Sequence, residues 1–443
     1  MTKLPRRAAS KTAAAALTAI FALTFAASAF AQTAAPPAPS TIDPADTAWM
    51  IVATAFVLMM TVPGLALFYA GMVRKKNVLA TMAQSLAAVA MISILWVVYG
   101  YSLVFTGDGA AIGTLERVML SGMTMTGVNA AAKTIPEALF VLYQMTFGVI
   151  TVALIAGSVA DRMRFSSYML FCAGWFTLVY VPLAHWVWGG GFLGQAGVLD
   201  FAGGLVVHLS AGTAGLVACL MMGSRRGYGS ENLAPYDLSL AVIGTGLLWV
   251  GWFGFNGGSA LQANSRAVMA IMSTHLAACA GALIWSALEW VTRRKPSVLG
   301  MVSGAVAGLG TITPASGFVS PGAGIVIGLV AGAVCFWACT SLKHRFKYDD
   351  TLDVFGIHGI GGLIGTLFVG VFASSAIGGV SGLLEGNPRQ LLLQFYGVAV
   401  TLVWTAGVTF VLLKAIDLMV KIRVSRESEV EGLDITQHGE ALQ

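Results

Sequence analysis

The sequence predicts an all-α membrane protein with eleven transmembrane helices. Its composition, its long apolar runs and the placement of its basic residues all indicate this fold class. Of the 443 residues, 57% are hydrophobic and only 10% are charged, whereas an ordinary soluble domain is about one quarter charged. Because so few charges cannot cover a water-facing surface, we exclude soluble enzymes, disordered proteins and nucleic-acid-binding proteins, and expect lipid as the surrounding medium.

Residues 1–31 are expected to form a secretory signal peptide, and residues 32–47 a flexible periplasmic lead. The first segment has four basic residues and no acid, an apolar run over 13–27, and Ala29-Phe30-Ala31 before Gln32. An apolar run of this length is too short to cross a membrane, and small residues are typical of a cleavage site. The alternative is a retained first helix, which the short run disfavours.

Eleven apolar runs follow, each a candidate to cross about 30 Å of hydrocarbon. They cover residues 48–71, 79–104, 136–159, 166–187, 202–222, 237–256, 267–291, 297–312, 321–342, 354–374 and 391–420. The eighth run is the shortest and stops before Pro314. We therefore expect a membrane domain over 48–420 and a cytoplasmic regulatory tail over 421–443.

Basic residues lie almost entirely in the loops of one side. Sixteen Lys and Arg residues follow the odd-numbered runs, whereas the opposite loops contain only Arg117, Lys133, Arg266 and Arg389. Lys and Arg concentrate in cytoplasmic loops. This asymmetry predicts a periplasmic amino terminus, as a signal peptide requires, and a cytoplasmic carboxyl terminus.

A weak internal repeat divides the first ten runs into two groups of five. Asp200 opens the fifth run, which contains His208, and Asp353 opens the tenth, which contains His358; the two histidines are 150 residues apart. Because five is odd, the second group must cross the membrane inverted relative to the first. Inverted repeats of this kind place the substrate site near the midplane, between the halves.

Few polar side chains interrupt the apolar runs, and such residues are candidates for a transport pathway. His208 and His358 can satisfy each other, one ring donating a proton and the other accepting it. The alternative is two separately satisfied core histidines, which their matched positions in the repeat disfavour. We interpret His275 as a packing residue and expect His185 to be solvated at the outer interface.

Asp200 precedes Phe201-Ala202-Gly203-Gly204 at the outer start of the fifth run. A carboxylate there can cap helix amides or act on a cation, and the sequence leaves both open. Aromatic residues and one hydroxyl recur at helical spacing near the outer ends of three runs: Tyr143 and Phe147, Trp188, and Trp252, Phe255 and Ser259. Such stripes are often core or interfacial packing, but their convergence predicts a cage for a small cation.

No catalytic or cofactor motif accompanies these residues. We find no P-loop, dinucleotide-binding motif, metal-ligand cluster or Ser-His-Asp arrangement in a soluble segment. The five cysteines fall inside apolar runs, where buried thiols usually serve packing. We therefore expect a non-enzyme without metal, cofactor or disulfide framework.

Five motifs in this order resemble the ammonium transporter family (Amt/Mep/Rh), specifically its bacterial branch. They are Val62-Pro63-Gly64-Leu65-Ala66-Leu67-Phe68-Tyr69, Trp96-Val97-Val98-Tyr99-Gly100-Tyr101-Ser102-Leu103, Asp200 to His208, Gly251-Trp252-Phe253-Gly254-Phe255-Asn256, and Asp353-Val354-Phe355-Gly356-Ile357-His358-Gly359. The resemblance covers about residues 46–440. It implies a homotrimer in the bacterial inner membrane with a pore through each subunit.

The resemblance also implies a role for each candidate residue. The residues implied to recruit ammonium are Trp188, Ser259, Tyr143 and Asp200. The residues implied to form the gate are Phe147 and Phe255. The pore and proton relay are implied to consist of His208, His358 and Trp252. Tyr143 departs from the bacterial pattern, which often has Phe at this position.

The resemblance extends to the tail. Residues 430–440 are similar to the tail of bacterial members that bind a PII-type signalling protein. Read without the resemblance, the segment is a solvated tail of mixed charge.

Three alternatives to ammonium uptake remain open. One is an electroneutral ammonia gas channel, and another is an ammonium sensor that acts through the tail. A potassium channel is disfavoured, because the sequence lacks a carbonyl-rich filter segment.

Overall fold

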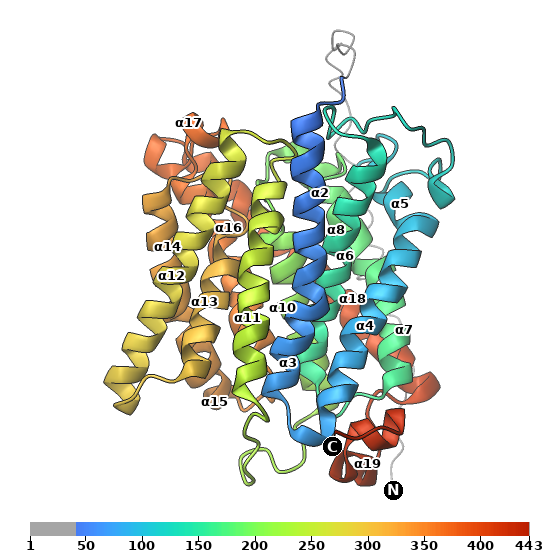
Figure 1. The fold of residues 1–443 in the computed structure, drawn as a ribbon, viewed down its shortest axis with the longest axis vertical. Coiled ribbons are helices and arrows are strands. Elements are labelled where there is room, and N and C mark those ends of the chain that lie inside the picture. The colour runs from blue at the N-terminus through green and yellow to red at the C-terminus, as the bar shows by residue number, and fades with distance from the viewer. Residues whose placement is uncertain (1–40, 443) are drawn as a thin grey trace, which may run out of the picture. The chain divides into compact units, whose positions relative to one another are not determined.

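The computed structural model describes residues 41–442 as a helical bundle without β-strands in that range (Figure 1). The predicted signal peptide over 1–31 and the first part of the lead lie outside the described residues. In the first half of the chain the α-helices are α2 (Pro44–Met59), α3 (Ala66–Met72), α4 (Val78–Leu95), α5 (Tyr101–Phe105), α6 (Glu137–Val159), α7 (Phe165–Trp175), α8 (Val181–Val187), α9 (Phe192–Ala196) and α10 (Ser210–Met222).

The second half repeats this pattern of long apolar helices. It contains α11 (Leu238–Trp252), α12 (Ser265–Arg293), α13 (Val298–Ile312), α14 (Pro321–Trp337), α15 (Lys343–Phe346), α16 (Ile360–Phe372), α17 (Ser375–Gly378), α18 (Pro388–Val420) and α19 (Arg426–Glu431). Short π-helical turns extend or join several of these, among them η6 (Gly204–Leu209), η7 (Phe253–Gly257) and η9 (Phe355–Gly359).

Ten continuous helical segments between residues 41 and 442 are long and apolar enough to cross a membrane. They correspond to ten of the eleven predicted runs, which confirms those runs as candidate spans. The eighth run forms α13, which has 15 residues. A helix of that length reaches only about 22 Å at 1.5 Å per residue, less than the ~30 Å hydrocarbon core. The membrane crossing by the eighth run, and with it the total of eleven, therefore stays a prediction.

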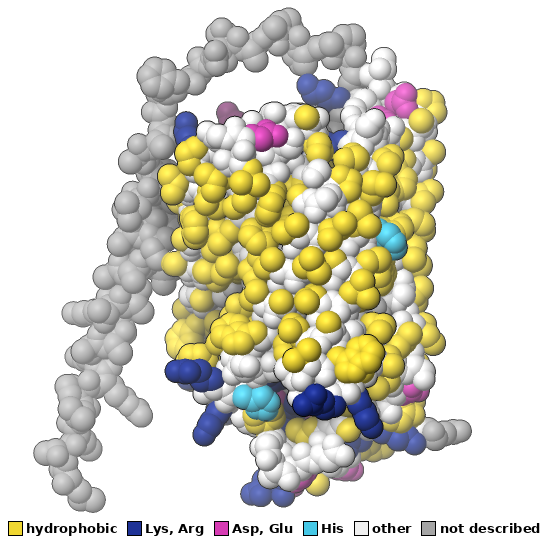
Figure 2. Space-filling view, turned by 90° about the vertical axis from the view of Figure 1, so that its left-hand side faces the viewer, with side chains coloured by type: hydrophobic (Ala, Val, Ile, Leu, Met, Phe, Trp, Pro, Cys, Tyr) yellow, Lys and Arg dark blue, Asp and Glu magenta, His cyan; other side chains and the backbone are white. Residues whose placement is uncertain are grey.

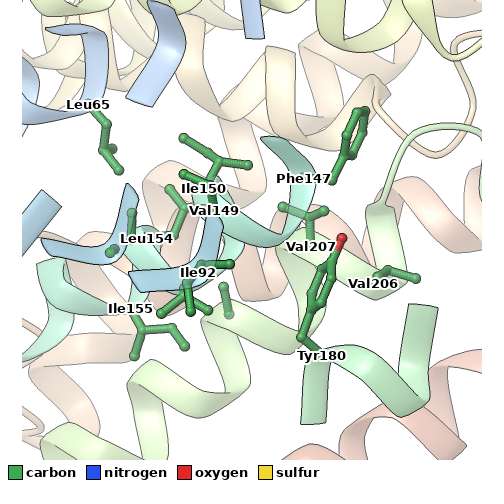
Figure 3. Packing of buried hydrophobic residues seen from close by; sticks show 14 of the residues in the cluster. Leu65, Ile92, Phe147, Val149, Ile150, Leu154, Ile155, Tyr180, Val206 and Val207 are labelled. Carbon is green, nitrogen blue, oxygen red and sulfur yellow. The ribbon is translucent and has the colours of Figure 1, made fainter. Parts of the chain in front are cut away.

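Hydrophobic side chains from several helices pack around α6, the most deeply buried of the long helices. Figure 3 shows part of this cluster, in which Phe147, Ile150 and Leu154 of α6 lie among residues of other helices. Figure 2 shows that the outer face is a broad hydrophobic band, with Lys and Arg gathered mainly along one end. An apolar interior together with an apolar outer face is what a lipid-embedded bundle requires.

Small residues let helices of the two halves approach closely. A Cβ atom on Gly212 of α10 would collide with the backbone nitrogen and Cα of Gly359. Gly359 directly follows His358 in η9, so this backbone contact sets where the second histidine lies. Close packing through glycine is the usual means of helix association in membranes.

The sequence analysis paired Asp200 with Asp353, but the structure shows that Asp350 is the counterpart of Asp200. Asp200 and Asp350 are separated by the same 150 residues as the two histidines. The Asp350 carboxylate accepts a hydrogen bond of 2.7 Å from the Phe355 amide at the start of η9. Asp353 instead pairs with Lys343 at 2.7 Å. The sequence motif concealed this, because Asp353 stands directly before the apolar run.

Ionic contacts concentrate at one end of the bundle, which we call the basic end. Asp161 contacts Arg74 at 3.0 Å and Arg225 at 3.5 Å, and Arg225 contacts Asp349 at 2.8 Å. Burial alone would raise the pKa of Asp349, but the hydrogen bonds and charge of Arg225 hold that pKa below its ordinary value. Asp349 is therefore ionised at neutral pH, and the two acids and two arginines balance one another.

The C-terminal segment packs against the basic end, whereas a solvated tail was expected. The Asp434 carboxylate accepts hydrogen bonds from the amides of Leu79 and Ala80, at 3.1 and 2.8 Å, and so caps the first turn of α4. The Leu433 amide donates to Asn77 at 2.8 Å. Leu433 and Asp434 are both buried, so this segment is an ordered part of the fold.

We predict that Gly212→Val destabilises the protein. Its side chain would meet backbone atoms that cannot turn away, and overpacking of this kind costs roughly 1–3 kcal/mol. The matched control is Gly246→Val in α11, where an added Cβ meets nothing within 4 Å. Thermal unfolding in detergent should show a lower midpoint for Gly212→Val alone. Equal midpoints for the two variants would contradict the close-packing argument.

Candidate functional site

The predicted recruitment residues meet at the end of the bundle opposite the basic end, which we call the mouth. The Tyr143 hydroxyl lies 3.3 Å from the Ser259 hydroxyl, and it donates to the carbonyl oxygen of Gly254 or of Phe255, at 3.0 and 2.9 Å. The Ser259 hydroxyl lies 2.8 Å from the same Phe255 carbonyl. When Ser259 donates to that carbonyl, its lone pairs are left to accept hydrogen bonds from a donor at the mouth.

Trp188 forms another wall of the mouth. Its ring lies edge-on to that of Phe147, with 5.8 Å between the centroids. Its indole nitrogen donates to the Asp200 carbonyl oxygen at 2.9 Å, which fixes the ring. Trp188 and Ser259 are partly exposed, whereas Tyr143 is fully buried. Tyr143 therefore supports the site from behind.

Two stacked rings separate the mouth from the interior. The centroids of Phe147 and Phe255 are 4.3 Å apart and their planes are inclined by 26°. Both rings are almost completely buried, at 2% and 0% exposure. Phe147 lies next to Trp188, and the Phe255 ring lies 6.1 Å from that of His208, so the ring pair stands between the mouth and the histidines.

Asp200 acts as a helix cap in this structure. Its two carboxylate oxygens accept from the backbone amides of Gly203, Gly204, Leu205 and Val206 at 2.6–3.2 Å. Asp200 is only 6% exposed, and its carboxylate is directed at the first turn of η6. Of the two roles that the sequence left open, helix capping describes these contacts: Asp200 holds the start of the π-helical turn that contains His208.

The two histidines lie together below the ring pair. Their Nδ1 atoms are 3.2 Å apart, and their ring planes differ by 13°. His208 also stacks against Trp252 at a centroid distance of 5.6 Å, and the Trp252 indole donates to the Thr313 hydroxyl at 2.8 Å. The His208 Nε2 atom is buried without a partner among the described residues. One ring therefore donates to the other through Nδ1, and His208 Nε2 remains available to a small polar molecule.

A narrow cavity runs beside this pair. It holds about 10 Å³ of free volume, which is close to the space that one water molecule needs. Apart from the two histidines its walls are apolar or aromatic, made by Met60, Leu65, Phe68, Ile150, Leu154, Leu248, Trp252, Phe255 and Val306. The cavity thus suits a small neutral molecule better than an ion.

The structure therefore brings all nine sequence-predicted residues into one column, from the mouth through the ring pair to the histidines. Sequence analysis missed Thr313, which holds the Trp252 ring, because a lone Thr near a helix end carries no distinctive pattern. His185 was expected to be solvated but is fully buried. No group of residues suited to binding a metal ion occurs between residues 41 and 442.

Comparison with known proteins identifies the family of the chain. The sequence model of the Ammonium Transporter Family matches residues 48–442. The ammonium transporter of Bacillus subtilis is 48% identical over 397 residues, which cover 89% of this chain and 97% of the relative. The ammonium transporter Amt1 of Archaeoglobus fulgidus is 45% identical over 394 residues, with 89% and 97% covered.

Solved structures show the same architecture. The crystal structure of Saccharomyces cerevisiae Mep2 superposes with a TM-score of 0.81 at 38% identity, covering 88% of this chain and 89% of that one. A structure entitled Sensor Amt Protein gives 0.82 at 27% identity, covering 89% and 98%. The family match spans nearly all of the described residues, and the chain belongs to the ammonium transporter family.

Proposed function

We propose that this protein takes up ammonium across the bacterial inner membrane by recruiting the cation, deprotonating it, and conducting ammonia and the proton separately. The observation that carries the proposal is the column itself. An aromatic mouth with a hydroxyl lies above a stacked ring pair, and below the pair is a cavity lined mainly by apolar side chains with two hydrogen-bonded histidines.

Recruitment takes place at the mouth. The π-faces of Trp188 and neighbouring rings attract a small cation, each contributing about 0.5–2 kcal/mol depending on desolvation. The Ser259 oxygen accepts one N–H of ammonium, while its own proton is donated to the Phe255 carbonyl, which fixes the hydroxyl. Tyr143 donates to the Gly254 or Phe255 carbonyl and so holds the backbone behind Ser259. Asp200 contributes by holding the helix start beneath Trp188.

The cost of desolvation explains why ammonium loses its proton before it enters the interior. A bare ion in an apolar medium faces an idealised penalty of tens of kcal/mol, whereas neutral ammonia does not. The cavity is lined mainly by apolar side chains and has room for about one water-sized molecule. Deprotonation near Phe147 and Phe255 therefore gives the lowest barrier.

The histidine pair then serves both products. Ammonia passes His208 and His358, while His208 Nε2 takes up the proton that ammonium loses, the Nδ1 proton of His208 moves to Nδ1 of His358, and His358 releases its Nε2 proton. Potassium is similar in size to ammonium and binds an aromatic cage as well, but it has no proton to lose. Selectivity thus depends on deprotonation and not on the size of the mouth.

The assembly and orientation complete the proposal. We place the mouth in the periplasm, with a cleaved signal peptide, and the basic end in the cytoplasm, because basic loops remain there. Three copies form a homotrimer in which each subunit keeps its own pore. The ordered C-terminal segment, anchored through Asp434, presents the cytoplasmic surface that a PII-type signalling protein binds.

One alternative has specific support. The similarity to a structure entitled Sensor Amt Protein is compatible with an ammonium sensor that acts through its cytoplasmic segment. A sensor would bind ammonium at the mouth without sustained flux. Measuring ammonium uptake into proteoliposomes separates the two functions, and we expect uptake well above that of protein-free vesicles.

We predict that His208→Ala abolishes the proton relay. General acid–base groups contribute about 10²–10⁴-fold, so the ammonium-evoked current should fall at least ~100-fold. His275→Ala is the matched control, because His275 also lies within a helical span but on an exposed face outside the column. The readout is current from reconstituted protein. A His208→Ala variant with normal ammonium current and full potassium exclusion would remove the histidine relay from the mechanism.

We predict that Asp200→Asn lowers stability and transport together. Asparagine has one acceptor oxygen where four amides now share two, and a buried donor left unsatisfied costs about 1–3 kcal/mol. Asp108→Asn, on an exposed loop, serves as the control. Thermal unfolding and uptake are measured on the same preparations. Unchanged stability with weakened ammonium binding would instead assign Asp200 a direct electrostatic role.

A further inference from the structure

His185 is a buried titratable group that the proposed mechanism does not use. It lies in the last turn of α8 and is completely inaccessible to solvent. Its Nδ1 atom lies 2.8 Å from the Val104 carbonyl oxygen, and its Nε2 atom lies 2.5 Å from the Gly109 carbonyl oxygen. Both ring nitrogens therefore face acceptors that have no proton to give.

This geometry favours one arrangement of ring protons. A neutral imidazole has one N–H donor and one lone-pair acceptor, whereas the imidazolium has two donors. With carbonyl oxygens at both positions, a neutral ring would aim one lone pair at a carbonyl lone pair. Only the doubly protonated ring makes two favourable hydrogen bonds.

The surroundings compensate the buried charge. Hydrogen bonds from a charged donor are about twice as strong as neutral ones, and a cation in the last helical turn interacts favourably with the helix dipole. No acidic side chain among residues 41–442 bonds to His185. On the packed elements, Tyr101 of α5 is engaged by Glu137 at 2.7 Å, and Asp108 beside Gly109 is exposed.

The His185 contacts join two segments of the mouth. The His185 carbonyl accepts from the amides of Gly189 and Gly191 at 3.0 and 2.9 Å, which shapes the turn after Trp188. The ring holds Val104 at the end of α5 and Gly109 in the loop that follows. Next to this contact, the Trp186 indole donates to the Ala111 carbonyl at 2.7 Å. His185 thus links residues 104–109 by hydrogen bonds to the C-terminal end of α8, which Trp188 directly follows.

We propose that His185 is a positioning residue for the ammonium recruitment site, held as a buried imidazolium whose two hydrogen bonds fix the loop over 104–111 against the helix end that bears Trp188. The residue touches neither ammonium nor the histidine pair. The positioning role rests on the proposed function, whereas the protonation state does not.

The protonation state is tested by NMR of protein with ¹⁵N-labelled histidine. The chain has six histidines, and the signals lost in His185→Gln identify this ring. We expect both of its nitrogens to show protonated N–H signatures at neutral pH. An unprotonated imine nitrogen would overturn the proposal. A variant with His275, His344 and His438 replaced by Gln leaves only His185 and the pore pair, so the assignment survives if His185→Gln does not fold.

The positioning role is tested by the kinetics of ammonium transport. Because His185→Gln retains only one of the two bonds, the half-saturating ammonium concentration should rise about fivefold while the maximal rate stays within about twofold. His275→Gln is the matched control and should change neither value. An unchanged half-saturating concentration in folded His185→Gln protein would overturn the positioning role. The NMR result does not depend on transport, so failure of the proposed function would be recognised separately.

Discussion

The arrangement of the site depends on the free-energy cost of placing a charge in a cavity that is lined mainly by apolar side chains and has room for only about one small molecule. The cavity beside His208 and His358 has free volume for about one water molecule, and in the proposed mechanism the stacked rings of Phe147 and Phe255 close it from the mouth. A hydrated ion does not fit, and a bare ion is too costly. In the proposed mechanism the polar groups of the site are therefore divided between the mouth, which holds the cation, and the histidine pair, which holds the proton.

Two matched π-helical turns provide the frame for this division. Each half contributes one π-helical turn with one histidine, and each turn begins near a buried aspartate, Asp200 or Asp350, that accepts from its first amides. The contact of Gly212 with Gly359 brings the two turns together. Because both histidines are held by backbone contacts near their own positions, the 3.2 Å separation of their Nδ1 atoms follows from helix packing and not from side-chain flexibility.

The sequence predicted the fold class, eleven spans of which ten are confirmed as candidates, and the residues of the column, because apolar runs and the polar groups within them are read directly from the order of the residues. The roles of Trp188, Ser259 and the ring pair came from family resemblance, since aromatic spacing alone also describes ordinary packing. Sequence patterns could not place His185 or the C-terminal segment. Their contacts are with backbone groups far away in the chain, such as the Val104 carbonyl for His185 and the Leu79 amide for Asp434, and no local pattern encodes such partners.

The most direct test of the central claim is the current evoked by ammonium and by potassium from reconstituted wild-type protein on a solid-supported membrane. The account predicts a transient current after an ammonium pulse and none after a potassium pulse, because only ammonium can lose a proton at the ring pair. Ammonium flux without current would show that no separate proton passes and would favour a gas channel. Current from both ions would contradict deprotonation as the source of selectivity.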